Sequence, residues 1–268
     1  MALPVIAWLS DFGTRNHYVG TMKGVALSIA PGATFIDITH QIDPQDVLGG
    51  ALELAAACRF FPAGTIFVAI VDPGVGSGRR AIAVNAGGYS FVAPDNGLLT
   101  FALRELGAKT AVELSEARFA LPTVSRTFEG RDRFAPAAAW LARGIALEDL
   151  GPAVAKIAEI TIPEPITTPN HLRGEVLLID HFGNAITNIS RRALESWSDG
   201  AGITLAAGSI RLDGLVSTYS QAAPGSPCAL VGSSDHLEVA VVNGHAATML
   251  GLTRGSIVTV SKVFGGNV

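Results

Sequence analysis

The sequence predicts an α/β domain with a mostly parallel sheet, followed by a smaller domain of mostly antiparallel β-strands. Three observations support this fold class. Short apolar runs alternate with segments of helical spacing up to about residue 160, which is typical of a parallel sheet with helices on its faces. A proline-rich stretch follows. Beyond it, short β-like segments separated by glycine turns replace the helices.

The elements of the first domain are predicted from apolar runs, helical spacing and the residues that end them. Apolar and β-branched runs predict strands at 5–9, 34–38, 65–71, 81–85 and 90–93. Helical spacing predicts helices at 18–30, 46–60, 96–106 and 133–143. Pro31-Gly32 ends the first of these helices, and Asp43-Pro44 opens the second, since proline is tolerated in a first helical turn.

The second domain is predicted to begin after a stiff linker. Prolines at 163, 165 and 169 do not fit a regular helix or a central strand, so we place the linker at about 160–172, between domains 1–165 and 172–268. Short strands are predicted at 174–179, 185–189, 203–205, 209–212, 228–231, 237–242 and 256–263. Only one short helix, near 192–197, is expected in this domain.

Composition and charge exclude several classes of protein. A formal net charge of −4 argues against nucleic-acid binding, which usually needs a basic face. There is no long run of Lys or Arg and no apolar run of about 18 residues, so we expect no membrane partner. The first residues lack the basic region and cleavage site of a signal peptide, which predicts a cytoplasmic protein. Cys58 and Cys228 are far apart and are expected to be reduced structural thiols.

The stretch VDPGVGSGRR, residues 71–80, follows the third predicted strand and contains an aspartate, glycines and two arginines. No Lys-Ser/Thr pair follows it, as a phosphate-binding Walker loop requires, and no G-x-G-x-x-G opens a helix. A glycine-rich hairpin and an active-site turn remain as interpretations. Asp11 and Asp95-Asn96 also follow predicted strands, and open α/β sheets bind ligands at the carboxyl ends of their strands. This arrangement favours a site that includes Asp72.

Five motifs occur in an order that resembles the S-adenosylmethionine hydroxide adenosyltransferases, whose close relatives include the fluorinases and chlorinases. They are SDFG at 10–13, IVDPGVGSGRR at 70–80, VAPDNGLLT at 92–100, TFEGRDRFAP at 127–136 and IDHFGNAITNI at 179–189. The resemblance runs nearly from end to end of the chain. It implies an N-terminal α/β domain, a C-terminal β-barrel-like domain, and a homotrimer with the ligand at a subunit interface, between one N-terminal and one C-terminal domain.

The resemblance also implies the reaction, which is hydrolysis of S-adenosyl-L-methionine to adenosine and L-methionine. Water, acting as hydroxide, attacks the C5′ carbon in line with the C–S bond and displaces methionine in an SN2 substitution. Methionine departs neutral at sulfur, so the step needs no general acid and we expect no metal or other cofactor. Alignment of the reacting atoms and removal of the proton are the two demands on the protein.

The polar residues around the water in this family are an Asp, an Arg and a His. Asp72 and Arg79 match the first two, whereas Glu129 stands where the family has a His in a T-F-H-G-R-D stretch. Glu129 is expected to accept a proton or to hold Arg79 in place. Two neighbouring carboxylates repel, and we expect an arginine to offset this repulsion: Arg79, Arg80 or Arg131. The replacement also raises an alternative, a non-catalytic or very slow protein that binds S-adenosylmethionine or adenosine.

A halide nucleophile, as in the fluorinating relatives, is a further alternative. Those relatives carry a Tyr where this chain has Asp72 and a Thr where it has Val75. A carboxylate about 4 Å from an anion costs about 4 kcal/mol at an effective dielectric near 20, which disfavours a bound halide. Water that is losing a proton tolerates the same field when Arg79 steadies the hydroxide.

Two more residues of the first domain are implied by the resemblance as substrate-binding residues. Asp11 matches the acidic residue that binds the ribose hydroxyls, because a carboxylate accepts hydrogen bonds from both at once. Its alternative role is the N-cap of the first helix. Phe128 resembles an aromatic residue beside the nucleoside, and its alternative role is packing in the core.

In the second domain, the resemblance implies that the IDHFGN segment contacts the amino-acid part and the adenine. Asp180 suits the substrate ammonium, and Phe182 can stack on the purine. Asn184 offers both a donor and an acceptor, which matches an adenine edge, although an ordinary hairpin turn is its alternative role. The other expected contacts are Ser233, near the methionine group, and Glu238 and Val241, beside the adenine.

Overall fold

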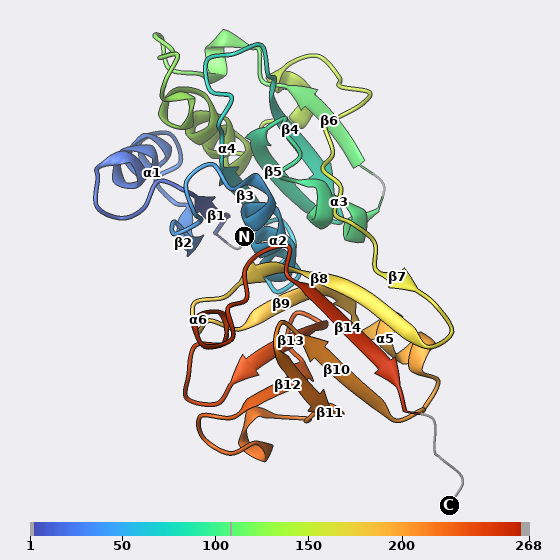
Figure 1. Ribbon diagram of the computed structural model, residues 1–268. Coiled ribbons are helices and arrows are strands. Elements are labelled where there is room, and N and C mark those ends of the chain that lie inside the picture. Colours follow the sequence, from blue (N-terminus) through green and yellow to red (C-terminus); the bar gives the residue numbers. More distant parts are fainter. Residues whose placement is uncertain (1–2, 108, 264–268) are drawn as a thin grey trace, which may run out of the picture. The chain divides into compact units, whose positions relative to one another are not determined.

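The computed structural model describes residues 3–107 and 109–263 (Figure 1). The chain divides into two compact units, Met1–Ile160 and Thr161–Val268. The first unit is a mixed sheet with helices, and the second is an antiparallel sheet nearly closed into a barrel, which confirms the predicted fold class. Within the described ranges, no helix is both long and apolar enough to cross a bilayer.

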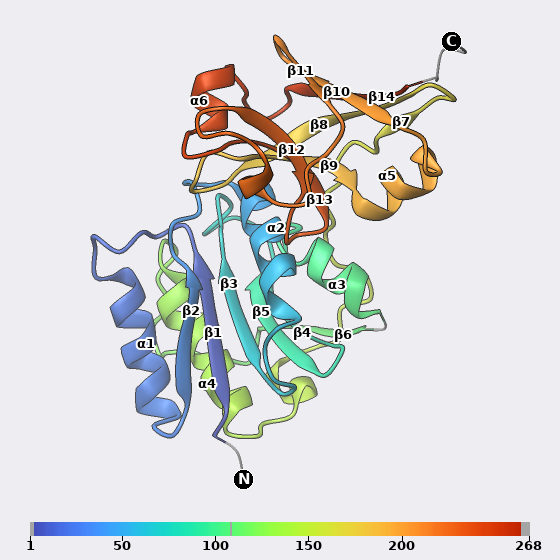
Figure 2. The same ribbon diagram turned by 90° about the horizontal axis from the view of Figure 1, so that it is seen from below.

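Six strands among the described residues of the first unit form one sheet, in the order β2-β1-β3-β5-β4-β6 (Figure 2). The parallel part consists of β2 (Thr34–Thr39), β1 (Val5–Ser10), β3 (Ile66–Ile70) and β5 (Tyr89–Pro94). β4 (Ala81–Ala86) pairs antiparallel with both β5 and β6 (Lys109–Glu113). The sequence prediction missed β6, because this edge strand buries only Val112 and so has no apolar run.

Helices cover both faces of this sheet. α1 (Tyr18–Ile29) and α4 (Ala135–Ala142) pack on the face that carries Trp8 and Val68. α2 (Val47–Cys58) and α3 (Thr100–Leu106) pack on the opposite face, with Leu9 and Phe67. Because successive side chains of a strand point to opposite faces, a strand covered on both sides needs the continuous apolar runs seen in β1 and β3.

The helix predicted at 96–106 begins only at Thr100. Asn96 instead belongs to the loop before it, where its side-chain Nδ2 donates to the carbonyl of Val71 at 2.8 Å. This bond fixes the loop against the end of β3, so two of the strand-end segments singled out in the sequence are in contact.

The helix predicted at 133–143 has an irregular beginning, since a π-helical turn at Gly130–Phe134 precedes α4. Pro136 has no N–H, so the carbonyl of Asp132 lacks its α-helical partner. The backbone N–H of Leu121 donates to that carbonyl instead, at 2.8 Å. The loop that follows β6 is therefore tied to the start of this helix.

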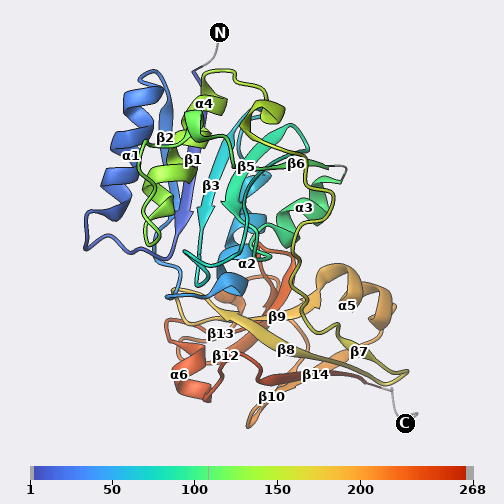
Figure 3. The same cartoon turned by 90° about the horizontal axis from the view of Figure 1, so that it is seen from above.

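The second unit is built on antiparallel strands, eight of them among its described residues, in the order β11-β10-β14-β8-β9-β13-β12 with β7 paired to β8 (Figure 3). The strands are β7 (Ile166–Thr167), β8 (His171–Ile179), β9 (Ala185–Ser190), β10 (Ile203–Ala207), β11 (Ile210–Asp213), β12 (Pro227–Val231), β13 (His236–Val241) and β14 (Ile257–Lys262). Val216, just after β11, donates its N–H to Ala229 O of β12 at 2.9 Å. That bond joins the two ends of the sheet and nearly closes it.

Two helices accompany this sheet within the described residues. α5 (Arg191–Ser198) confirms the predicted short helix and begins at the N-cap Ser190, whose side chain accepts from Ala193 N. α6 (Ala246–Leu250) shows that the expectation of a single helix was wrong. Five residues are too few to display a 3.6-residue period, so pattern alone does not reveal a helix of this length.

Candidate functional site

The segment 71–80 is a turn at the carboxyl end of β3. Asp72 O accepts the N–H of Val75 at 3.3 Å, and Gly74 O accepts the N–H of Ser77 at 3.0 Å. β3 and β4 are not neighbours, because β5 lies between them, so the glycine-rich hairpin interpretation is wrong. Gly76 has a φ of +74°, and a β-carbon there would collide with the carbonyl of Arg126. The turn can therefore lie directly against the segment that leads to Glu129.

Arg79 holds the two carboxylates of this region together. Its Nε lies 3.0 Å from both Oδ1 and Oδ2 of Asp72, and its Nη2 also donates to Oδ2. The same Nη2 lies 2.6 Å from Oε2 of Glu129. The exposed fractions of the side chains are 6% for Asp72, 10% for Arg79 and 14% for Glu129. A single guanidinium thus bridges two largely buried carboxylates.

The electrostatics of the three residues follow from this burial. Burial alone would lower the pKa of the Arg79 guanidinium, but the hydrogen bonds and charge of Asp72, and then the close contact and charge of Glu129, raise the pKa above its usual value. Arg79 is therefore a permanent cation between two acids. Its guanidinium also lies over the ring of Phe134, 5.4 Å from the centroid, which limits its movement.

Of the three arginines considered as a counter-charge, Arg79 alone bridges the pair. Arg80 donates from Nε to Asp95 Oδ2 at 2.8 Å and from Nη2 to Lys156 O at 2.7 Å. Arg131 pairs with the adjacent Asp132, with Nε 2.5 Å from Oδ1. These are separate ion pairs at the edge of the site.

Glu129 lies next to a tightly packed glycine, and its carboxylate contacts two arginines. Gly130 lies so close to the core that a β-carbon there would come within 2.8 Å of Met22 Sδ. Oε2 of Glu129 is buried and accepts no well-directed hydrogen bond among the described residues, so its contact with Arg79 is mainly one of charge. Oε1 lies 3.9 Å from Nε of Arg133, one helical turn further on.

Asp11 lies near this group at the end of β1. Its Oδ2 accepts the backbone N–H of Gln45 at 2.8 Å. Burial raises the pKa of Asp11 above its ordinary value of 3.8, and the negative charge of Asp72 raises it further, outweighing the bond from Gln45. The N-cap interpretation is wrong, because His17 occupies that position of α1 and makes no side-chain cap. The Asp11 carboxylate is left as an acceptor beside Asp72.

A chain of polar side chains holds the SDFG turn in place, and the sequence prediction did not include it. The buried Ser10 Oγ lies 2.7 Å from His40 Nδ1, and His40 Nε2 lies 3.0 Å from Asp37 Oδ1. Lys23 Nζ completes the chain, 2.6 Å from Asp37 Oδ2. The backbone of His40 also accepts the N–H of Gly13 at 2.7 Å. His40 therefore forms hydrogen bonds with Ser10 and Gly13, which lie on either side of Asp11.

Phe128 is buried, with aromatic neighbours on one side. Its ring centroid is 5.1 Å from that of Tyr18 and 6.1 Å from that of Phe12, both in edge-on geometry. The guanidinium of Arg131 lies 5.2 Å from its centroid. Phe128 thus packs in the core, as one interpretation of the sequence expected. It also lies next to Glu129 in the chain, which is compatible with the other interpretation, a place beside the nucleoside.

In the second unit, Asp180 organises the turn between β8 and β9. Its Oδ1 accepts the N–H groups of Phe182 at 2.9 Å and of Asn184 at 2.8 Å, and its Oδ2 accepts from Asn184 Nδ2 at 2.9 Å. Asn184 is buried in this turn, so it is both a hairpin residue and the partner of Asp180. The Phe182 side chain, in contrast, is 73% exposed. The turn presents an aromatic ring on a rigid base.

The remaining predicted residues of the second unit lie in β13 and in the turn before it. Glu238 is buried and accepts a hydrogen bond from the hydroxyl of Tyr219. Burial raises the pKa of Glu238, and the charge of Asp180 adds to this despite the bond from Tyr219. Val241 is buried at the end of β13, and Ser233 is exposed in the turn before that strand. The structure brings Asp180, Asn184 and Glu238 together.

The sequence was compared with known proteins. Residues 6–151 match the SAM hydroxide adenosyltransferase N-terminal domain, and residues 174–259 match the C-terminal domain of the same family. The chain belongs to this family. It is 40% identical to an (R)-S-adenosyl-L-methionine hydrolase of Salinispora tropica, with 96% of this chain and 98% of that protein covered.

Other known proteins are similar over nearly the whole chain. An (R)-S-adenosyl-L-methionine hydrolase of Thermus thermophilus is 39% identical over 93% of this chain and 96% of that protein. A fluorinase of an Actinoplanes species is 33% identical over 97% and 98%. A crystal structure of an uncharacterized conserved protein from Thermotoga maritima superposes with a TM-score of 0.89 at 32% identity, covering 96% of this chain and all of that one. The resemblance inferred from the five motifs is confirmed.

For this member of the SAM hydroxide adenosyltransferases, sequence reasoning missed three supporting residues: His40, Gln45 and Tyr219. Gln45 contacts Asp11 and Tyr219 contacts Glu238 from a distance in sequence, whereas His40 contacts Ser10 and Gly13, which flank Asp11. The one available signal was the histidine that directly follows β2, which ends at Thr39. Among the described residues, no cluster of three or more His, Cys, Asp or Glu has the arrangement of a metal site.

Proposed function

We propose that this protein hydrolyses S-adenosyl-L-methionine to adenosine and L-methionine by attack of water, as hydroxide, on C5′. The observation that carries the proposal is the Asp72–Arg79–Glu129 bridge, in a chain that belongs to the SAM hydroxide adenosyltransferases. The relatives named (R)-S-adenosyl-L-methionine hydrolase, at about 40% identity over nearly the whole chain, support the same reaction.

The chemistry requires two things of the bridge. A new C5′–O bond forms as the C5′–S bond breaks, the electron pair of that bond stays on sulfur, and the water loses one proton. A carboxylate of Asp72 or Glu129 accepts this proton, and the Arg79 cation stabilises the developing hydroxide. Because the sulfonium leaves as a neutral thioether, the step needs no metal or other cofactor.

The substrate is held by residues of both units in this proposal. Asp11 binds the ribose hydroxyls, since its carboxylate is fixed by Gln45 and keeps further acceptor capacity. Phe128 borders the nucleoside. In the second unit, Asp180 serves the ammonium, Phe182 stacks on the purine and Asn184 pairs with the adenine edge. The other contacts are Ser233, Glu238 and Val241.

We further propose a cytoplasmic homotrimer in which the ligand lies between the first unit of one subunit and the second unit of another. The support is the exposed ring of Phe182. Asp180 already stabilises the turn that carries it, so the ring is available to stack on a ligand held by another subunit. A binding module without catalysis and a halide-using enzyme are less favoured. Two buried carboxylates around one arginine repel a halide, and they supply the proton acceptor that only hydrolysis uses.

The experiment is incubation of the purified protein with S-adenosyl-L-methionine in ¹⁸O-labelled water, followed by mass spectrometry. We expect equal amounts of adenosine and methionine, with the label in the 5′-hydroxyl of adenosine. Absence of product above the spontaneous decay measured without protein would overturn the proposal. Addition of chloride is the control for the halide reaction, which predicts 5′-chloro-5′-deoxyadenosine in place of labelled adenosine.

A further inference from the structure

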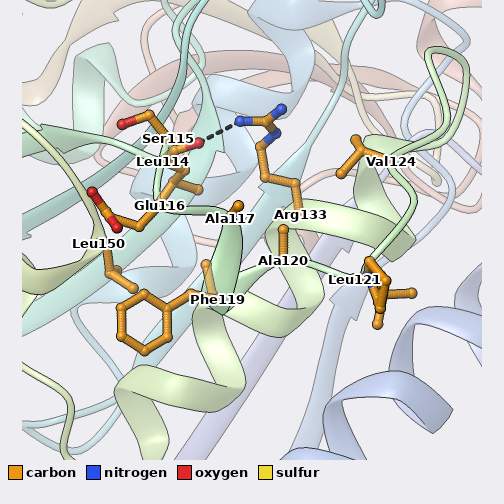
Figure 4. Close-up of a pocket in the computed structure, with 12 residues that line it drawn as sticks. Leu114, Ser115, Glu116, Ala117, Phe119, Ala120, Leu121, Val124, Arg133 and Leu150 are labelled. Carbon is orange, nitrogen blue, oxygen red and sulfur yellow. Dashed lines mark hydrogen bonds between the residues drawn. The ribbon is translucent and has the colours of Figure 1, made fainter.

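The first unit contains a small cavity away from the turn of Asp72. Its volume is about 210 Å³, and it lies between the loop that follows β6 and the start of α4 (Figure 4). Ring and aliphatic side chains line most of it, among them Leu114, Phe119, Leu121 and Val124. This volume is below the roughly 300–1,000 Å³ of pockets that hold drug-sized ligands, so the cavity has the size for a smaller molecule.

Arg133 supplies the charge of this cavity. Figure 4 shows its side chain beside Leu114, whose carbonyl accepts a hydrogen bond from Nη1. Nε is buried and makes no hydrogen bond, and Nη2 has no hydrogen-bond partner among the described residues. A guanidinium has five N–H donors. Arg133 therefore has unused donors at the wall of a mostly apolar space, which Ser115 and Glu116 also line.

The acid nearest to the cavity does not neutralise this arginine. Glu116 lines the cavity, but its half-exposed carboxylate lies 4.0 Å from the Nε of Arg118. Oε1 of Glu129 is 3.9 Å from Arg133 Nε, beyond hydrogen-bond distance, and Glu129 is already shared with Arg79. Cationic donors that make no hydrogen bond, beside a wall made mostly of apolar side chains, are complementary to a ligand that has one anionic head and a short aliphatic tail.

We propose that this cavity binds a short-chain monocarboxylate, with its carboxylate on Arg133 and its tail against Phe119 and Leu121. A planar guanidinium and a planar carboxylate make strong paired hydrogen bonds. A phosphate ester fits less well, because the lining contains a single arginine to balance a second negative charge. The cavity is held open by fixed bonds: Leu121 N donates to Asp132 O at 2.8 Å, and Ser125 N donates to Asp132 Oδ2 at 2.7 Å.

A ligand in this place acts on the proposed catalytic group through Arg133. Arg133 and Glu129 are one helical turn apart, and Glu129 in turn contacts Arg79. A carboxylate bound to Arg133 neutralises the cation that faces Glu129 and strengthens the negative field around Arg79. The cavity is thereby a site for an effector that alters the rate of proton removal. This last step rests on the proposed function, whereas the binding itself does not.

The test is isothermal titration calorimetry of the full-length protein with butanoate and hexanoate, without S-adenosylmethionine. We expect saturable binding of one carboxylate per chain and none of the neutral hexanamide. Arg133→Gln should weaken the affinity about ten- to a hundredfold, as expected for the loss of charge-assisted hydrogen bonds. Arg143→Gln is the matched control, since this exposed arginine at the end of α4 does not line the cavity, and it should bind like the wild type.

A second variant keeps the proposal testable if Arg133→Gln fails to fold. Ala120→Leu fills the cavity from the half-buried side of the loop that follows β6 and leaves the arginine in place. It should abolish hexanoate binding while the melting temperature stays close to that of the wild type. Absence of binding to the wild type, equal binding of hexanamide, or undiminished binding to the folded Ala120→Leu variant would each overturn the proposal. None of these outcomes depends on whether S-adenosylmethionine is hydrolysed.

Discussion

Arg79 binds Asp72 within a single turn, with its Nε 3.0 Å from both carboxylate oxygens seven residues earlier in the chain. The contact is local and largely buried, so it forms whenever the turn forms. Its second partner, Glu129, comes from a distant segment and meets the same Nη2 nitrogen. In the proposed mechanism one of the two carboxylates accepts the water proton, and the following variants separate their roles.

Removal of the Asp72 charge should reduce kcat strongly. In the Asp72→Asn variant the side chain keeps its size, but it loses a candidate proton acceptor and half of the charge that fixes Arg79. We expect kcat to fall about 10²–10⁴-fold, the usual contribution of a general base, with a smaller change in KM. Chromatography of adenosine measures the rate. Asp95→Asn is the control, because the buried Asp95 pairs with the partly exposed Arg80, and its loss should cost stability without a comparable loss of kcat.

Replacement of Glu129 tests whether this carboxylate positions Arg79 or takes the proton. Glu129→Gln keeps an acceptor near Nη2 and removes the charge, so loss of one charge-assisted contact predicts a fall in kcat of about ten- to a hundredfold. A positioning role predicts that the pH profile of kcat keeps its shape. Loss of the acidic limb of that profile in Glu129→Gln, with the limb retained in Asp72→Asn, would instead identify Glu129 as the base. In the same assay Glu129→His shows whether an imidazole supports a higher rate.

The Asp72–Arg79 pair shows what the sequence could predict and what it could not. Asp72 was identifiable from its place at the end of a parallel strand, where α/β sheets bind ligands, and Arg79 from the family resemblance. The sequence left open which of Arg79, Arg80 and Arg131 offsets the repulsion between Asp72 and Glu129, because the meeting of these segments depends on Gly76 docking against Arg126, fifty residues away. The fold class was predicted from the alternation of strands and helices, because this alternation does not depend on the exact bounds of each element.

The residues that support the site could not be predicted from the sequence for a related reason. His40 meets Ser10, and Tyr219 meets Glu238, through tertiary packing that leaves no spacing rule in the sequence. Asp180 was predicted to face an ammonium group, whereas its oxygens accept three hydrogen bonds from its own turn. A carboxylate oxygen has more than one lone pair, so Asp180 can stabilise its turn and also bind an ammonium group. Only the stabilisation of the turn is visible in the local geometry.

The raised pKa of Asp11 should make the melting temperature of the protein depend on pH. Its raised pKa means that the folded protein holds a proton at Asp11 more tightly than the unfolded chain. The stability from this group is fully present below pH 3.8 and is lost as the pH rises through the raised pKa. Asp11→Asn, which cannot ionise, should therefore melt at a higher temperature than the wild type at pH 7. The difference should narrow as the pH falls toward 3.8.

The same variant should bind adenosine more weakly, because a neutral amide replaces the acceptor for two ribose hydroxyls. Thermal melting and calorimetry measure the two effects on one sample. Asp43→Asn, at an exposed position before the loop of Gln45, is the control and should change neither. A lower melting temperature for Asp11→Asn at pH 7 would contradict the assignment of Asp11 as an unfavourably buried charge.

Phe182 should matter for the ligand and not for the fold. Its side chain is 73% exposed, so Phe182→Ala should leave the free energy of unfolding within about 0.5 kcal/mol of the wild type. Stacking of an aromatic ring on a base contributes about 1–3 kcal/mol, which predicts a loss of adenosine affinity of about five- to a hundredfold. Phe60→Ala is a close match, since Phe60 is 76% exposed in the first unit, and it should leave the affinity unchanged. Equal affinities for all three proteins would remove Phe182 from the site.

The proposed placement of the ligand between two subunits predicts that inactive variants rescue each other. Asp72→Asn damages only the first unit, and Asn184→Ala damages only the second, where it removes the partner of Asp180. If each site combines the first unit of one subunit with the second unit of another, mixed oligomers contain some sites with both halves intact. Random mixing of the co-expressed chains makes roughly a quarter of the sites intact, so about a quarter of the wild-type rate should return. Sites confined to one chain predict no more activity than the average of the two separate variants, and co-expression of Asp72→Asn with Arg79→Lys, both in the first unit, provides that baseline.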